Sequence, residues 1–184
     1  MKVSEIIQKY KLYTCDEIES WDTDERFELI DGVIYMMSSP MRIHQKISGE
    51  LFVQLYNFLK GKTCEVYSAP FAVYLGGNDT RVEPDIVVVC DKSKLIDKGC
   101  KGAPDLVIEI LSPSTAKHDR ITKFNKYLQT GVREYWIVDP DSQTISVHTL
   151  ESGKYVVSAY SDDDKIPVNV LEGCEIKARE VFAE

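Results

Sequence analysis

The sequence predicts an α/β or α+β fold in which helices flank a mixed central β-sheet. The expected elements follow one another as helix, several strands, helix and further strands, an order typical of this layered class. Residues 86–90 and 105–111 are rich in branched apolar side chains, the pattern of strands covered on both faces. A chain of 184 residues that is 43% hydrophobic and shows no repeat fits one core, so we expect a single domain over residues 1–184.

Residues 1–25 are expected to be a helical addition to a core formed by residues 26–184. Thr14 and Glu17 have the Thr-x-x-Glu spacing of a capping box, which predicts a short helix there. Asp31-Gly32 separates two apolar-rich stretches of residues 27–37, and this dipeptide is typical of a two-residue hairpin turn.

The longest helix is expected over residues 43–59, and Gly61 ends it. Its apolar stripe recurs at three- and four-residue spacing and consists of Ile43, Ile47, Leu51, Leu55, Phe58 and Leu59. Residues 64–75 are expected to form one or two strands, with a turn at 76–79.

A second helix is expected over residues 116–130, because serines and a threonine at 112–115 can cap it and Gly131 can end it. Two strands, at residues 134–138 and 144–149, are expected on either side of the turn at 139–141. Another pair is expected near residues 155–160 and 167–170.

The charge and the cysteines exclude several classes of protein. A formal net charge of −8 argues against non-specific coating of nucleic acid, although residues 117–133 hold five basic side chains against one acidic side chain. No apolar run approaches the length of a membrane span, and the N-terminus lacks a signal peptide, so a cytoplasmic protein is expected. The five cysteines are widely spaced, and all are expected to be reduced.

Glu109 lies in the middle of an apolar strand, where a glutamate is almost never fully buried without a partner. The Glu109 carboxyl group must therefore be protonated and neutral, pair with a cation, or face a solvent-filled cleft. Asp85 begins the neighbouring apolar strand, and two carboxylates on adjacent strands can hold Mg²⁺. Asp105 is the rival carboxylate, because it also follows a proline and shares the strand face of Glu109.

Helical geometry favours Lys123 as the partner amine. Ile121, Phe124 and Leu128 define the expected buried stripe, which leaves Lys126 opposite it in solvent. Lys123 lies on a flank, from which a long side chain can reach the sheet edge. Two other cations of this helix, Lys117 in its first turn and Arg120 beside Lys123, stay candidates.

Plainer interpretations of the same residues stay open. Pro-Asp before a strand is common turn chemistry, so Asp85 can be structural. Glu109 can form a salt bridge to Arg120 or Lys123 for stability alone. His44 can be a core or capping histidine, and the Tyr135-Trp136 pair is more typical of a core than of base stacking.

The run GAPDLVIEILSPSTAKHDRITKFNKYLQTGVREYWIVDP, with FELIDGVIYMMS and VEPDIVVV, resembles the Uma-type family of restriction endonucleases within the PD-(D/E)XK nuclease superfamily. The resemblance implies a restriction-endonuclease-like core with an extra N-terminal hairpin and C-terminal strands. Asp85 and Glu109 match the family's metal-binding carboxylates, helped by the main-chain carbonyl of Ile110. The superfamily lysine slot is Leu111 here, and the family's helical lysine corresponds to Lys123.

The resemblance also implies a function and further site residues. We expect an endonuclease dependent on Mg²⁺ (or Mn²⁺) that hydrolyses DNA with a metal-activated water positioned by Lys123. Four more residues are candidates: Glu50 as an indirect metal ligand, His44 as a phosphate or water contact, and Lys117 and Arg120 as guides for the DNA backbone. A homodimer is expected. The alternatives are a catalytically inactive binding or regulatory protein on the same fold, and a nuclease acting on RNA.

Overall fold

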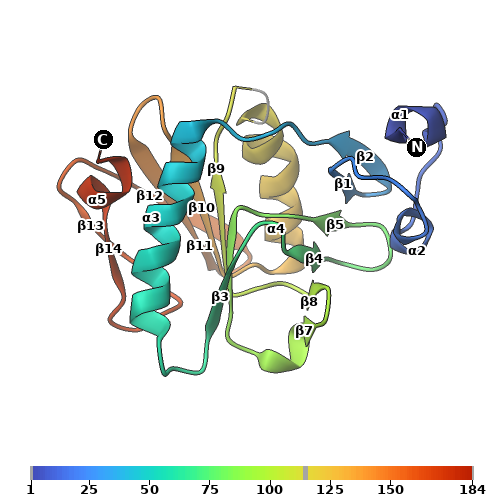
Figure 1. The fold of residues 1–184 in the computed structure, drawn as a ribbon. Coiled ribbons are helices and arrows are strands. Elements are labelled where there is room, and N and C mark those ends of the chain that lie inside the picture. Colours follow the sequence, from blue (N-terminus) through green and yellow to red (C-terminus); the bar gives the residue numbers. More distant parts are fainter. Residues whose placement is uncertain (1, 114–115, 184) are drawn as a thin grey trace.

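The core of this computed structural model, which describes residues 2–113 and 116–183, is a six-stranded mixed sheet (Figure 1). Only β9 and β10 run parallel, and the other neighbours are antiparallel. The order across the sheet is β12 (Lys154–Ser161), β11 (Thr144–Glu151), β10 (Glu134–Asp139), β9 (Leu106–Ile110), β6 (Ile86–Val89) and β3 (Glu65–Ser68). The predicted mixed sheet is therefore confirmed.

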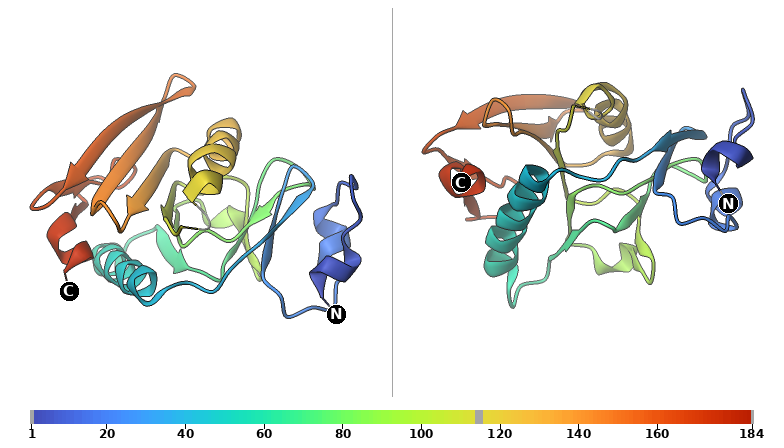
Figure 2. Two further views of the ribbon diagram at one scale, coloured as in Figure 1. Left: turned by 90° about the horizontal axis from the view of Figure 1, so that it is seen from above. Right: turned by 45° about the horizontal axis from the view of Figure 1, so that its top comes forward.

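The two faces of this sheet pack against different partners, because successive side chains of a strand point to opposite faces. Ile86, Ile108 and Ile110 face the long helix α3 (Arg42–Leu59) and the C-terminal helix α5 (Ala178–Phe182). Val87 and Val107 face α4 (Phe124–Thr130) and a second sheet. Figure 2 shows α3 and α4 on opposite sides of the core strands. Glu109 lies on the face of α4, since it alternates with Ile108 and Ile110.

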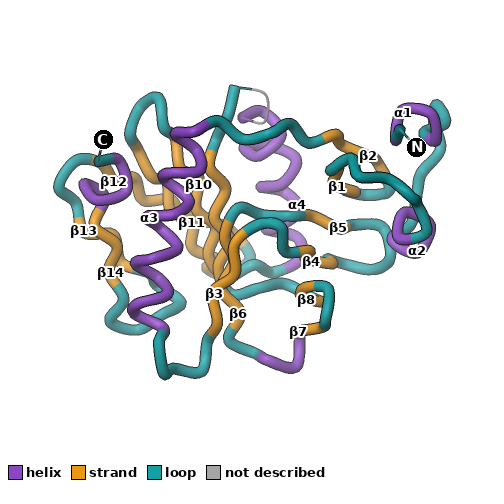
Figure 3. Tube along the Cα trace, viewed as in Figure 1, coloured by secondary structure: helices purple, strands orange, loops and turns teal. Residues whose placement is uncertain are grey.

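The second sheet was not expected as a separate layer. Its strands are β2 (Val33–Met36), β1 (Phe27–Ile30), β5 (Arg81–Val82), β4 (Ala72–Tyr74), β8 (Gly99–Lys101) and β7 (Leu95–Ile96), in spatial order. Figure 3 shows these short strands beside the long strands of the core. A strand of two or three residues is too short to display alternation, which is why the sequence pattern missed β5, β7 and β8.

The predicted N-terminal elements are confirmed. The hydroxyl of Thr14 accepts a hydrogen bond from the Glu17 amide and caps α2 (Cys15–Glu19). The β1–β2 hairpin turns at Asp31 and Gly32, whose φ angles of 51° and 77° suit a two-residue turn. α3 buries four members of the predicted stripe, Ile47, Leu51, Leu55 and Leu59. The remaining short elements are α1 (Val3–Ile6) and the 3₁₀ turn η1 (Lys92–Lys94).

The second predicted helix exists, but its first half is a π-helical segment, η2 (His118–Lys123), continuous with α4. Gly131 ends it at φ 82°, as expected. The predicted caps at Ser114 and Thr115 lie outside the described residues. The predicted buried stripe is wrong at Ile121, which is 52% exposed, and Lys126 is buried, whereas Phe124 packs against the core as expected. A wider π turn changes the angle between successive side chains, so a stripe extrapolated at 100° per residue misses the buried side.

The C-terminal strands are partly as predicted. β12 covers the expected strand near residues 155–160. The strand expected at 167–170 is wrong, because β13 (Lys165–Pro167) ends at its proline and pairs with β14 (Glu175–Lys177). Proline has no amide hydrogen for the ladder, which accounts for the end of β13.

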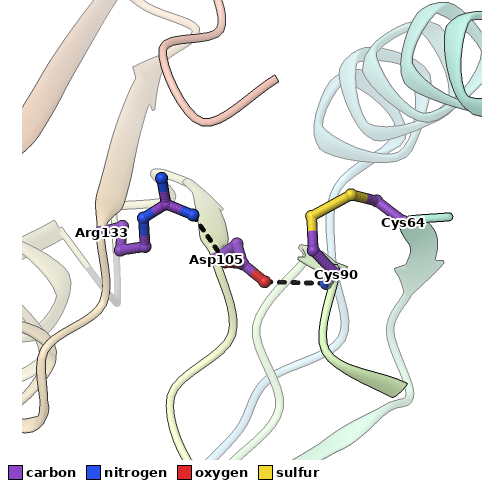
Figure 4. Close-up of a disulfide and its surroundings, with 4 residues drawn as sticks. All are labelled: Cys64, Cys90, Asp105 and Arg133. Atoms are coloured by element: carbon purple, nitrogen blue, oxygen red, sulfur yellow. Dashed lines mark hydrogen bonds and ion pairs between the residues drawn. A yellow bond between two sulfur atoms is a disulfide. The ribbon is translucent and has the colours of Figure 1, made fainter. Parts of the chain in front are cut away.

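The expectation of five reduced cysteines is wrong for one pair. Cys64 and Cys90 form a disulfide beside the β3–β6 ladder, and the amide of Cys90 donates to Asp105 (Figure 4). The two cysteines are 26 residues apart, but the antiparallel register that pairs Glu65 with Val89 places them opposite each other. Spacing in the sequence could not show this. Cys15, Cys100 and Cys174 are free and buried.

Over residues 2–113 and 116–183, no helix is both long enough and apolar enough to cross a membrane.

Candidate active site

Asp85 lies directly before β6, and Glu109 lies in the neighbouring antiparallel strand β9. The ladder pairs Ile86 with Ile108 and Val87 with Val107, and the same register sets Asp85 opposite Glu109. Directly opposed residues project from the same face, with Cβ atoms about 5 Å apart. Both carboxylates therefore belong to one site on the face of the sheet toward α4.

Asp85 is held by two elements besides its own strand. Its Oδ2 accepts a hydrogen bond from the amide of Ile110 at 2.8 Å and lies 3.1 Å from Nε2 of His44, on α3. The expected histidine thus reaches the carboxylate. His44 is a buried side chain near the first turn of α3, so the start of this helix is fixed against the ends of β6 and β9.

Glu109 has two partners, which accounts for a carboxylate within a buried strand. Its Oε1 accepts hydrogen bonds from Nζ of Lys123 at 3.0 Å and from the hydroxyl of Tyr127 at 2.7 Å. Glu109 is only 3% exposed and Lys123 only 4%. Lys123 therefore lies where the helical position predicted, although it is buried rather than on a solvated flank.

Lys123 is shared among three carboxylates. Its Nζ lies 3.0 Å from Oε1 of Glu28 and 3.4 Å from Oδ1 of Asp119, besides Glu109. Burial opposes its charge, but Glu109, Glu28 and Asp119 together raise the pKa of Lys123 well above its ordinary value. The surrounding carboxylates therefore favour the protonated amine at the centre of this cluster.

One cation cannot neutralise all of these carboxylates. Burial raises the pKa of Glu109 well above its ordinary value, helped by Asp119, Asp85 and Glu28 and opposed by Lys123. For Glu28 burial also acts upward, but Lys123, the nearby imidazole of His118 and a hydrogen bond from the Glu83 amide lower its pKa to about 2. An additional positive charge beside Glu109 would favour its ionised form.

These groups line a cleft of about 350 Å³. Its charged lining consists of Arg26, Glu28, Glu83, Asp85, Glu109, Asp119 and Lys123, and its other polar lining includes His44, Gln45, Ser112 and His118. The lining comes from the β1–β2 hairpin and the segment that follows it, from Asp85 before β6, and from Glu109 and Ile110 of β9. A cleft of this volume can hold a phosphate group together with a water molecule.

The structure does not bring the other expected residues into this cleft. Glu50 is half-buried further along α3 and does not line it. Asp105 lies at the opposite end of β9, where it pairs with Arg133 at 2.9 Å (Figure 4). Lys117 is exposed, and Arg120 pairs with Asp139 at 2.9 Å beside an adjoining groove.

Two more corrections concern the expected helix. Lys126 is buried instead of solvated, and its amine pairs with Asp31 of the β1–β2 turn. Tyr127, which is fully buried, and Phe124, which is partly buried, pack this helix against the apolar core. Charged residues occupy the buried side of η2 and α4 because carboxylates from the second sheet and β9 meet them there.

Sequence reasoning missed Glu28, Asp119 and Tyr127. A signal for Glu28 was present, since FELI places a glutamate within a four-residue strand that is buried throughout. A glutamate within an otherwise apolar strand is the same feature that identified Glu109. For Asp119 and Tyr127 the linear pattern holds no comparable signal, because their burial depends on the π-helical turn.

We predict that Glu28 makes the fold sensitive to acid. Its pKa is lowered in the folded state, so its contribution to stability is present above the ordinary pKa near 4.5 and is lost as the pH falls toward 2. Urea titrations between pH 7 and pH 2 should show a larger loss of unfolding free energy for the wild type than for Glu28→Gln. Equal losses would mean that Glu28 has no such ionic role.

Comparisons with known proteins place this geometry in a family. The sequence pattern of the family described as "Uma2: Putative restriction endonuclease" matches residues 15–179. An uncharacterised protein of Synechocystis sp. is 29% identical over 160 residues, which cover 85% of this chain and 84% of that protein. A second protein of that organism, also uncharacterised, is 24% identical over 118 residues, which cover 62% of this chain and 67% of that protein.

A solved structure shares the fold. The crystal structure of a putative nuclease belonging to DUF820, from Anabaena variabilis, matches with a TM-score of 0.77 at 23% identity, over 92% of this chain and 97% of that one. The restriction-endonuclease-like fold expected from the sequence is thereby confirmed. Because the family pattern extends from α2 into α5, this chain belongs to the Uma2 family of putative restriction endonucleases.

Proposed function

We propose that this protein is a metal-dependent endonuclease that hydrolyses phosphodiester bonds of DNA in the cleft of Asp85 and Glu109. The observation that carries the proposal is the placement of these two carboxylates opposite each other in one cleft, with the amine of Lys123 3.0 Å from Glu109. Membership in a family of putative restriction endonucleases supports the reaction class.

The donor set fits Mg²⁺ or Mn²⁺. The hydrogen bonds to Asp85 and Glu109 from described residues are accepted by Oδ2 of Asp85 and Oε1 of Glu109. Oδ1 of Asp85 and Oε2 of Glu109 accept none from the described residues, so these two oxygens are the proposed metal ligands. The described residues form no cluster of three or more His, Cys, Asp or Glu ligands. Two carboxylates suit a hard cation that keeps several waters, and the carbonyl of Ile110 is the expected third ligand.

When bound, such a cation would lower the pKa of a water molecule and neutralise charge that builds up on the phosphate. The protein's own side chains would orient the two carboxylates that hold the cation. Lys123 orients Glu109 through its 3.0 Å hydrogen bond, and the surrounding carboxylates raise its pKa, which favours the protonated amine. His44 orients Asp85 from the other side of the cleft.

Arg26 replaces Lys117 and Arg120 as the proposed contact for the nucleic-acid backbone. It lines the cleft, its side chain is 42% exposed, and it is held by Glu83 at 2.8 Å. Guanidinium groups bind phosphate oxygens well because they present donors in a planar fork. Because Glu83 also pairs with Arg81 at 2.6 Å, it fixes the orientation of the Arg26 side chain.

The test is cleavage of a supercoiled plasmid with and without Mg²⁺ or Mn²⁺. The wild type should nick the plasmid only with metal, and Asp85→Asn should be inactive while it melts at the wild-type temperature. Asp105→Asn is the matched control, since it also changes an aspartate that follows proline but lies outside the cleft. Wild-type protein that is inert on DNA with either metal would overturn the proposal; a single-stranded RNA substrate tests the RNA alternative alongside.

One observation favours a second function, a binding or regulatory protein without turnover. Lys123 is 4% exposed and its amine is surrounded by three carboxylates, so it has little access to a substrate. On this alternative the protein would bind nucleic acid without cutting it. The same plasmid assay, combined with a gel-shift measurement, separates the two functions.

A further inference from the structure

An exposed apolar rim borders the cleft of Asp85 and Glu109. Three of the chain's four methionines lie at residues 36–41, and all three line the cleft. Met36 is 51% exposed and Met41 is 59% exposed. Apolar side chains that gather on a surface mark an interaction site, whereas single scattered ones do not. The name methionine rim is used below for Met36, Met37, Pro40, Met41 and Ile43.

The rim is held at both ends and continues past the cleft. The amide of Met37 donates to the carbonyl of Arg26 at 3.0 Å, and the amide of Gln45 donates to the carbonyl of Met41 at 3.1 Å. Beside the cleft lies a smaller groove of about 190 Å³, and Ile43 lines it. The cleft and the groove share the lining residues Met41, His44, Ser112 and Pro113. A polymer bound in the cleft can therefore continue into the groove along the rim.

The charges of the two hollows do not suit a ligand that is held mainly through its phosphates. Carboxylates outnumber cations in the cleft, and Asp139 and Asp141 outnumber Arg120 in the groove. Of the two cations that line the cleft, Lys123 is buried, so only Arg26 is exposed. Non-specific binding to duplex DNA comes almost entirely from neutralising phosphates. This lining cannot supply such binding, even with one divalent cation added.

The bases of a nucleic acid are the parts that the rim can hold. Methionine is flexible and polarizable, and its sulfur makes favourable contacts with aromatic rings. Bases of a double helix are stacked inside it, whereas bases of an unpaired strand are free to pack against protein side chains. We propose that the substrate of this cleft is unpaired DNA, and that the bases beside the reacting phosphate pack on the methionine rim. This inference rests on the proposed nuclease function, which places the reacting phosphate in the cleft.

Binding in the absence of metal tests the inference independently of cleavage. In a buffer with EDTA, fluorescence anisotropy should show that a labelled single-stranded oligonucleotide binds at least about tenfold more tightly than the same sequence in a duplex. The slope of log K against log salt should be no steeper than about −1.5, which corresponds to roughly two phosphates. Duplex that binds equally well or better, or a steeper slope, would overturn the proposal.

A double variant tests the rim itself. Met36→Ser/Met41→Ser removes two exposed apolar side chains, so it should weaken binding of the single strand about fivefold or more while it melts at the wild-type temperature. Val156→Ser/Val157→Ser is the matched control, because these side chains are 50% and 54% exposed but line neither hollow. This control should bind as the wild type does. A rim variant that binds as tightly as the wild type would rule out the rim as the contact for the bases.

Cleavage of relaxed plasmid separates failure of this inference from failure of the proposed function. Negative supercoiling favours local opening of the duplex, so supercoiled plasmid should be nicked at least about tenfold faster than relaxed closed plasmid. Equal rates would leave the nuclease function standing and contradict a requirement for unpaired bases. If neither plasmid were nicked, the nuclease function would fail, and the metal-free binding measurements would still decide whether the rim holds unpaired DNA.

Discussion

Lys123→Met is expected to lower the free energy of unfolding by about 3–5 kcal/mol and to abolish cleavage. The change removes the cation between Glu28, Glu109 and Asp119, all of which are buried. Breaking a buried pair from one side leaves uncompensated charge, and losses of that order are typical. Urea denaturation at pH 7 and the plasmid assay measure the two effects.

Lys126→Met is the matched control for this experiment. Lys126 is a buried lysine one turn later in the same helix, but its partner is Asp31, whose side chain is 65% exposed. Pairs with an exposed partner contribute about 0–1 kcal/mol, so this variant should lose little stability and keep its activity. If both variants were equally destabilised, the cluster around Lys123 would have no special role in stability.

Glu109→Gln is expected to reduce cleavage by about a thousandfold or more while leaving stability at pH 7 within about 1 kcal/mol of the wild type or above it. Burial raises the pKa of Glu109, so its ionised form is costly in the folded protein without metal. Glutamine keeps an oxygen that accepts from Lys123 and Tyr127. Initial cleavage rates and urea denaturation of the metal-free protein test the two parts.

The control for Glu109→Gln is a second buried glutamate on the adjacent strand. Glu134 accepts hydrogen bonds from Nε1 of Trp136 at 2.6 Å and from the amide of Val170 at 2.9 Å, and it does not line the cleft. Glu134→Gln should therefore cleave at the wild-type rate. A marked loss of stability in Glu109→Gln with cleavage retained would show that Glu109 is structural.

The sequence was sufficient for the core and for the two strand carboxylates because their signals are local. A glutamate in an apolar strand and an aspartate at the start of the next one are visible without knowledge of the fold. Strand alternation then places Glu109 on one face, but it places Asp105 there as well. Only the register between β6 and β9 shows that Asp85 lies beside Glu109, whereas Asp105 is at the other end of β9.

The rest of the site depends on contacts that no local pattern encodes. The π-helical turn at His118–Lys123 alters the helical phase, so Lys126 is buried and Ile121 exposed, the reverse of the expectation. Glu28 reaches Lys123 only because the second sheet folds over α4. The Cys64–Cys90 pair likewise follows from the β3–β6 register and not from spacing.

Binding of Mn²⁺ to the free protein tests the central claim most directly, because it needs no knowledge of the natural substrate. Isothermal titration calorimetry of the wild type should show one Mn²⁺ bound per chain, and Asp85→Asn should weaken that binding at least tenfold while Asp105→Asn leaves it unchanged. Wild-type protein that takes up no Mn²⁺ at millimolar concentration, or an Asp85→Asn variant that binds it equally well, would contradict a metal site between these two strands.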